Sequence, residues 1–168
     1  MPRTITMKGS PLTLEGLELI VGQKAPDFAL TANDLNLKTM KDYAGKALII
    51  ATVPSLDTGV CDMETRRFNS EIAGLSKEIK ILTVSCDLPF AQARWCGAAG
   101  VDKLETLSDY RERSFGRAYG VLIKELMLLG RAVFVIDKNG KITYTQIVPE
   151  LTKEPDYKAA LDAAKAVA

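Results

Sequence analysis

The sequence predicts an α/β fold with a mixed central sheet flanked by helices. Residues 47–53, apolar except for Thr52, and residues 79–86 have the composition of strands buried on both faces, as in a parallel sheet. Each of these runs is followed by a segment with the pattern of a helix. Between two later apolar runs, Asn139-Gly140 is the strongest hairpin signal in the chain and adds antiparallel strands to the fold.

The N-terminal part of the chain predicts a small hairpin that extends this fold. Residues 4–14 alternate apolar and polar side chains around Gly9-Ser10-Pro11, which is the pattern of two short strands and a turn. Residues 22–28 then predict a surface turn that leads into a short strand, and residues 35–40 are a candidate partner for that strand.

The helix after the first buried strand carries the most informative residue, Cys61. Pro54 follows that strand, and Cys61, Phe68, Ile72 and Leu75 are spaced i, i+7, i+11 and i+14. This spacing places the four side chains on one helical face, so we expect Cys61 to lie in the first turn and on the buried side of its helix.

The remaining elements complete the predicted order of strands and helices. After residues 79–86, Asp87-Leu88-Pro89 predicts a helix with an acidic cap and an early proline that ends near Gly97. Further strands are expected at residues 104–107, 131–136 and 142–148, and further helices at residues 109–118 and 155–166. This order is typical of a thioredoxin-like fold with an N-terminal hairpin extension, in one domain that spans residues 1–168.

Composition argues against several classes of function. The chain has 22 basic and 21 acidic side chains, so its charge gives no reason to expect nucleic acid as a partner. Residues 1–20 lack a continuous apolar signal region, and no apolar run approaches the roughly 20 residues of a membrane helix. We therefore expect a cytoplasmic protein without membrane association. Three cysteines and no histidine disfavour both a secreted disulfide framework and a structural zinc site.

The position of Cys61 points to thiolate chemistry. Because the chain has no histidine, the sulfur cannot be activated by an imidazole base, as in cysteine proteases. The free N–H groups and the positive end of the dipole at a helix N-terminus favour thiolate over thiol. Arginine and hydroxyl side chains are the other candidates for activating Cys61.

The spacing Pro54-x-x-x-Thr58-x-x-Cys61, together with the distant Arg131, resembles the active-site pattern of peroxiredoxins. Other segments are similar to the bacterial thiol peroxidases, a subfamily of atypical two-cysteine peroxiredoxins: residues 25–28, 87–92, 96–97, 131–135 and 154–157. The resemblance covers essentially the whole chain. It implies a thioredoxin-fold homodimer that reduces hydrogen peroxide or organic hydroperoxides and is recycled by thioredoxin, without metal, haem or flavin. It also implies that Cys96 is the resolving cysteine, which attacks a sulfenic acid on Cys61.

The resemblance assigns roles to residues that also have simpler interpretations. Thr58 can present its hydroxyl to the sulfur or the peroxide, or it can be a helix cap. Pro54 can wall the pocket against water, since it has no N–H, or merely end a strand. The catalytic role of Arg131 rests on the resemblance alone, because a single arginine at a strand end usually faces solvent. We expect Cys86 to be a buried structural thiol.

Charged residues in the helix of Cys61 receive no catalytic role. Glu64 and Arg66 or Arg67 follow the cysteine by one turn or more and are candidates to orient Arg131, but charges on a helix usually face solvent, so we leave them out of the catalytic set.

Two other functions remain open on the same fold. A general thiol-disulfide oxidoreductase usually carries Cys-x-x-Cys, which this chain lacks. A redox-sensing interaction protein would use the same disulfide to alter a partner surface. Peroxide turnover separates these functions, because a sensor oxidises stoichiometrically whereas an enzyme consumes many equivalents.

Overall fold

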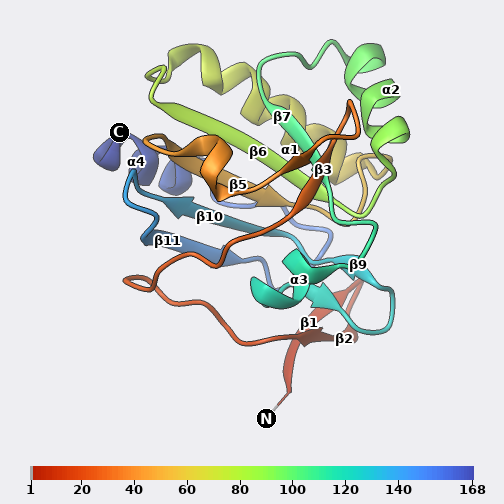
Figure 1. The fold of residues 1–168 in the computed structure, drawn as a ribbon. Coiled ribbons are helices and arrows are strands. Elements are labelled where there is room, and N and C mark those ends of the chain that lie inside the picture. Colours follow the sequence, from red (N-terminus) through yellow and green to blue (C-terminus); the bar gives the residue numbers. More distant parts are fainter. Residues whose placement is uncertain (1) are drawn as a thin grey trace.

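A seven-stranded mixed sheet forms the centre of the protein (Figure 1). The computed structural model describes residues 2–168. The strands of this sheet are β3 (Leu30–Ala32), β4 (Leu37–Lys38), β5 (Ala47–Thr52), β6 (Ile79–Ser85), β7 (Glu105–Ser108), β10 (Ala132–Ile136) and β11 (Ile142–Ile147). Their spatial order is β11-β10-β5-β6-β7-β3-β4, with β5, β6 and β7 parallel and with β10 and β3 antiparallel to their neighbours. The predicted mixed sheet of an α/β fold is confirmed.

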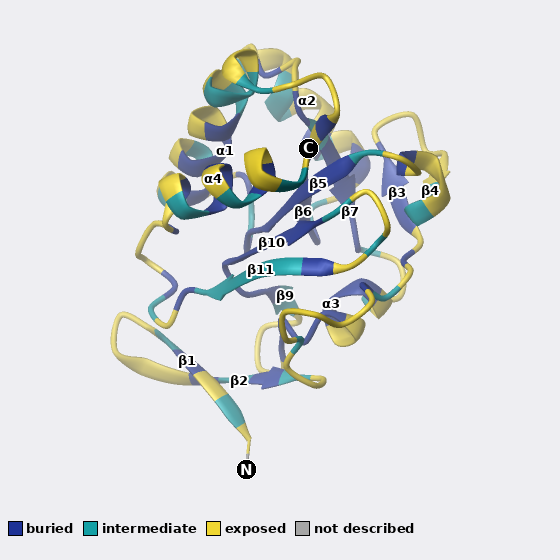
Figure 2. Cartoon of the chain, turned by 90° about the vertical axis from the view of Figure 1, so that its left-hand side faces the viewer, coloured by how far each residue is buried: buried dark blue, intermediate teal, exposed yellow. Residues whose placement is uncertain are grey.

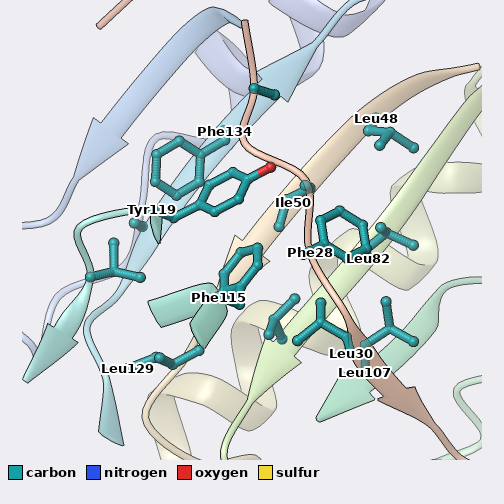
Figure 3. Close-up of a cluster of buried hydrophobic side chains, with 14 of the residues drawn as sticks. Phe28, Leu30, Leu48, Ile50, Leu82, Leu107, Phe115, Tyr119, Leu129 and Phe134 are labelled. Atoms are coloured by element: carbon teal, nitrogen blue, oxygen red, sulfur yellow. The ribbon is translucent and has the colours of Figure 1, made fainter. Parts of the chain in front are cut away.

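Both faces of the central strands are covered. The helices are α1 (Gly59–Glu71), α2 (Pro89–Ala99), α3 (Ser114–Ala118) and α4 (Tyr157–Val167), with short 3-10 helices at Met40–Tyr43 and Ile72–Gly74. β5 is buried along its whole length (Figure 2). Ile49 packs in a cluster with side chains of α1 and α4. Leu48 and Ile50 pack on the opposite face with Phe115 of α3 (Figure 3). This explains why the sequence of β5 is apolar without alternation.

No helix within residues 2–168 is long and apolar enough to cross a membrane. The longest of them, α1, has only 13 residues. A helix rises 1.5 Å per residue, so this length is well below the thickness of a bilayer's hydrocarbon core.

The N-terminal hairpin is confirmed, but it belongs to a larger sheet than expected. β1 (Arg3–Met7) and β2 (Ser10–Glu15) pair around a turn at Lys8 and Gly9, both with positive φ, and not around Gly9-Ser10-Pro11. β2 also pairs with β8 (Leu122–Ile123), which pairs with β9 (Leu128–Leu129). These two-residue strands are too short for hydrophobic periodicity to indicate them.

Three predicted helix boundaries are wrong. α2 continues through Gly97 to Ala99, and its C-cap residue Gly100 has a φ of 69°, the left-handed conformation typical of a helix C-terminus. α3 begins at Ser114, because Asp109 accepts hydrogen bonds from the N–H groups of Phe115 and Gly116 across a wide turn. α1 ends at Glu71, so of the four residues expected on one face only Cys61 and Phe68 lie in it.

The hairpin at Asn139-Gly140 is confirmed. β10 and β11 pair on either side of it, and Gly140 has a φ of 85°, which suits glycine. The Asp137 carboxylate accepts hydrogen bonds from the N–H groups of Asn139 and Lys141, each at 2.9 Å. The turn therefore sets the register of β10 against β11.

Candidate active site

Cys61 lies in the first turn of α1, directly after the loop that follows β5. Thr58 is the N-cap residue: its Oγ1 accepts a hydrogen bond from the Cys61 N–H at 3.3 Å and donates to the Ser55 carbonyl at 3.2 Å. The exposed fraction of Cys61 is 0%. The predicted position of the cysteine is therefore confirmed. In this structure the hydroxyl of Thr58 caps the helix.

Arg131 reaches the sulfur from the neighbouring strand. Ala132 pairs with Thr52, so the residue before it lies at the end of β5 from which the loop to Cys61 begins. The Arg131 Nη2 lies 3.4 Å from the Cys61 Sγ, and Nε and Nη2 donate to the Leu151 carbonyl at 3.1 and 2.9 Å. The side chain is only 2% exposed, so this arginine does not face solvent. The structure thus brings the two predicted residues into contact.

Glu64, which was left out of the catalytic set but was a candidate to orient Arg131, does contact that arginine. Its side chain is fully buried, and its Oε1 lies 3.3 Å from the Arg131 Nη1. Burial raises the pKa of this carboxyl from 4.5 to about 7, although the guanidinium of Arg131 opposes the rise. Glu64 stands one turn after Cys61 and one turn before the buried Phe68, and this spacing was the available signal. Arg66 and Arg67 face solvent as expected.

The loop between β5 and α1 is fastened by Asp87. The Asp87 carboxylate accepts hydrogen bonds from the Ser55 hydroxyl at 2.7 Å, the Leu56 N–H at 2.8 Å and the Ser85 hydroxyl at 2.7 Å. The expectation that Asp87 caps α2 is wrong, since the N-cap position belongs to Leu88. Pro54 is buried at the start of this loop. Asp87 therefore ties the loop before Cys61 to the strand end that leads into α2.

Cys96 lies in the last part of α2, as predicted, and it is partly buried. Its Sγ lies 3.5 Å from the Thr106 Oγ1 on β7. The preceding residue, Trp95, packs against the small cluster that Cys61 forms with Val53 and Leu56. Both Cys61 and Cys96 are free thiols in the structure. Trp95, next to Cys96 in sequence, is thus a neighbour of the Cys61 cluster.

Cys86 is buried, as expected, at the end of β6. Burial raises the pKa of its thiol to about 12, with a further contribution from the charge of Asp109. A thiol with such a pKa is almost entirely protonated at neutral pH. Since the thiolate is the nucleophile, these surroundings suit packing better than reaction.

A buried thiol at the first turn of a helix, in contact with an arginine from an adjacent strand of a mixed sheet, defines a thiol redox protein of the thioredoxin-like class. The Redoxin family matches residues 20–161. The thiol peroxidase of Bacillus subtilis (strain 168) is 56% identical to the chain over 163 residues, which cover 97% of each protein. The chain belongs to the redoxin family and, within it, to the thiol peroxidases. The predicted resemblance and fold are confirmed.

Solved structures agree with this membership. A peroxiredoxin-like protein from Aquifex aeolicus superposes with a TM-score of 0.92 at 43% identity, covering 100% of this chain and 99% of that one. A thiol peroxidase from Chromobacterium violaceum superposes with a TM-score of 0.87 at 21% identity, covering 95% of this chain and 94% of that one. At such low identity the second comparison shows a shared fold alone.

Proposed function

We propose that the protein reduces hydrogen peroxide and organic hydroperoxides with Cys61 as the attacking thiol. Family membership makes it a thiol-dependent peroxidase, an oxidoreductase of the peroxiredoxin type. The observation that carries the residue assignment is the 3.4 Å contact between the Arg131 Nη2 and the Cys61 Sγ. It places a permanent positive charge and N–H donors beside the sulfur, and a nucleophilic thiolate needs such surroundings.

In the peroxide-reducing step, the Cys61 thiolate attacks one oxygen of the peroxide. The S–O bond forms while the O–O bond breaks, so the sulfur is oxidised to sulfenic acid and the other oxygen leaves as water or alcohol after taking up a proton. The N–H groups of Arg131 and the hydroxyl of Thr58 would stabilise the charge that grows on the leaving oxygen. Pro54, which offers no N–H, would keep the pocket dry.

In the resolving step, Cys96 attacks the sulfenic acid. The sulfur–sulfur bond forms, the S–O bond of Cys61 breaks, and water leaves with the proton of the Cys96 thiol. Reduced thioredoxin then cleaves this intramolecular disulfide by thiol–disulfide exchange. This cycle needs no metal or organic cofactor, and it suits a reducing compartment such as the cytoplasm.

A homodimer is part of the same proposal. Leu88 and Phe90, at the start of α2, are 53% and 67% exposed. Neighbouring exposed apolar side chains of this size are typical of an interaction surface. Since Asp87 links this end of α2 to the loop before Cys61, a second copy bound there would lie close to the active site.

A coupled assay tests the proposal. Consumption of hydrogen peroxide, tert-butyl hydroperoxide and cumene hydroperoxide is measured with thioredoxin, its reductase and NADPH. We expect many turnovers per subunit in the wild type, none in Cys61→Ser, and a single equivalent in Cys96→Ser. Stoichiometric oxidation of the wild type without turnover would instead identify a redox sensor. Undiminished turnover in Cys61→Ser would contradict the assignment of the attacking thiol.

A further inference from the structure

Trp95 and Cys96 of α2 pack against one shared hydrophobic cluster, but they differ in their other contacts. Trp95 packs against the cluster formed by Cys61, Val53 and Leu56. The Cys96 sulfur contacts Thr106 and borders a separate cavity of about 370 Å³, lined by residues of the β3–β4 region and β7. Successive residues of a helix point about 100° apart, so Trp95 and Cys96 do not both point toward the Cys61 cluster in this helix. For Cys96 to reach Cys61 and form the proposed disulfide, Trp95 would have to give up this position.

Polar contacts between α1 and α2 hold Trp95 in this position. The indole Nε1 donates to the Asp62 Oδ1 at 2.9 Å, and the Asp62 Oδ2 pairs with the Arg66 Nε at 2.9 Å. The Arg66 Nη1 donates to the Ala99 carbonyl at 3.2 Å, and its guanidinium carbon lies 5.9 Å from the centre of the Trp95 ring. We call Asp62, Arg66, Trp95 and Ala99 the α1–α2 latch. It joins the residue after Cys61 to the residue before Cys96.

We propose that the α1–α2 latch holds Trp95 against the cluster of Cys61 in the reduced protein, and that its release limits the rate of the disulfide-forming step. Asp62, Arg66 and Trp95 are then positioning residues, because they act on the approach of Cys96 and not on the reacting atoms. This inference rests on the proposed function, in which Cys96 resolves a Cys61 sulfenic acid.

The latch has a second consequence, because the sulfenic acid has two competing fates. Attack by Cys96 gives the disulfide and water. Attack on a second peroxide molecule inserts another oxygen at the same sulfur and gives sulfinic acid, with water or alcohol as the other product. A latch that delays the first reaction lengthens the life of the sulfenic acid. Release of the latch should therefore protect Cys61 from overoxidation.

Two substitutions remove the latch by different routes. Trp95→Phe keeps an aromatic ring but deletes the N–H donor, and Asp62→Ala deletes the acceptor. The matched control is Glu71→Ala, which breaks the ion pair between Arg67 and Glu71 at 3.0 Å. This pair has the same i, i+4 spacing on α1 as the pair of Asp62 and Arg66, but neither of its residues belongs to the latch. Asp62→Asn serves as the rescue variant, because an amide oxygen can still accept the indole hydrogen bond.

Quenched-flow mass spectrometry with dimedone measures sulfenic acid and disulfide separately. We expect disulfide formation about fivefold faster in Trp95→Phe and Asp62→Ala, corresponding to about 1 kcal/mol at 1.4 kcal/mol per factor of ten. We also expect that, in these two variants, a proportionally higher peroxide concentration is needed to convert half of Cys61 to sulfinic acid. Glu71→Ala should match the wild type, and Asp62→Asn should lie close to it.

The outcomes separate the latch from the function on which it rests. Unchanged or slower disulfide formation in Trp95→Phe, with sulfenic acid and disulfide both detected, would overturn the latch alone. Absence of either species in the wild type would overturn the proposed cycle. Thermal unfolding of each variant shows whether it is folded, and Trp95→Phe decides the question if Asp62→Ala does not fold. Equal acceleration in Glu71→Ala would indicate general loosening of α1 and would also overturn the latch.

Discussion

Glu64→Gln should change the way in which stability depends on pH. The carboxyl of Glu64 is fully buried, its Oε1 faces Arg131, and its Oε2 has no hydrogen-bond partner within residues 2–168. Burial raises its pKa from 4.5 in the unfolded chain to about 7 in the folded protein. Glutamine has nearly the same shape and can still accept the hydrogen bond from Arg131, but it does not titrate.

The direction and size of the effect follow from proton linkage. Between pH 4.5 and about 7 the unfolded chain has released the Glu64 proton and the folded protein has kept it, so stability falls as the pH rises. The contribution is fully present below the unfolded pKa and is lost above the folded one. At about 1.4 kcal/mol per pKa unit the whole loss is about 3 kcal/mol, of which about 2 kcal/mol falls between about pH 5.5 and pH 8.

Urea unfolding of the wild type and of Glu64→Gln at these two pH values measures the effect. We expect the stability of Glu64→Gln, relative to that of the wild type, to rise by about 2 kcal/mol from the lower to the higher pH. The buried Asp109, whose pKa is raised to about 6, titrates in both proteins and cancels in the difference. Parallel pH profiles would refute the claim that Glu64 keeps its proton in the folded protein.

Two further substitutions test the site. Arg131→Met should slow the reaction of Cys61 with peroxide at least a hundredfold in stopped-flow kinetics. It should also cost about 3 kcal/mol in urea unfolding at pH 8, because Glu64 loses its counter-charge; wild-type kinetics would exclude a role for the guanidinium. Cys86→Ser should retain thioredoxin-linked turnover and lose about 1 kcal/mol of stability, since a hydroxyl replaces a buried thiol. Loss of turnover in a folded Cys86→Ser would show that this thiol reacts.

The parts of the fold that depend on local pattern were predictable. The uninterrupted apolar sequence of β5 and the Asn139-Gly140 turn identify their elements without reference to the rest of the chain. β8 and β9 escaped prediction because two-residue strands carry no period, and they exist through pairing with the N-terminal hairpin. Asp87 was misinterpreted for a similar reason. Its sequence position suits a helix cap, whereas its carboxylate bonds to a loop 31 and 32 residues away.

In the site, too, the features set by neighbouring residues were predictable from the sequence, and those set by contacts between distant residues were not. The first-turn position of Cys61 follows from its neighbours in sequence. Contact with Arg131 depends on the register of β10 against β5, and the sequence alone could suggest it only through resemblance to a family. Glu64 was a candidate to orient Arg131 but was left out of the catalytic set because helix charges usually face solvent, whereas this one is paired with the buried guanidinium.

The arrangement of α2 also limits how much of it would have to move for the proposed Cys61–Cys96 disulfide to form. Gln92 is fully buried, and its Nε2 donates to the Ser85 hydroxyl and to the Leu107 carbonyl, each at 2.9 Å. These bonds fasten the first turn of α2 to β6 and β7. The part beyond Gln92 contains Gly97, which weakens a helix by about 1 kcal/mol relative to alanine. Unwinding of residues 93–99 alone would carry Trp95 away and free Cys96, while the loop before Cys61 keeps its bonds to Asp87. The anchored first turn would thus separate the movement of Cys96 from the part of the site that holds Cys61 for the proposed reaction with peroxide.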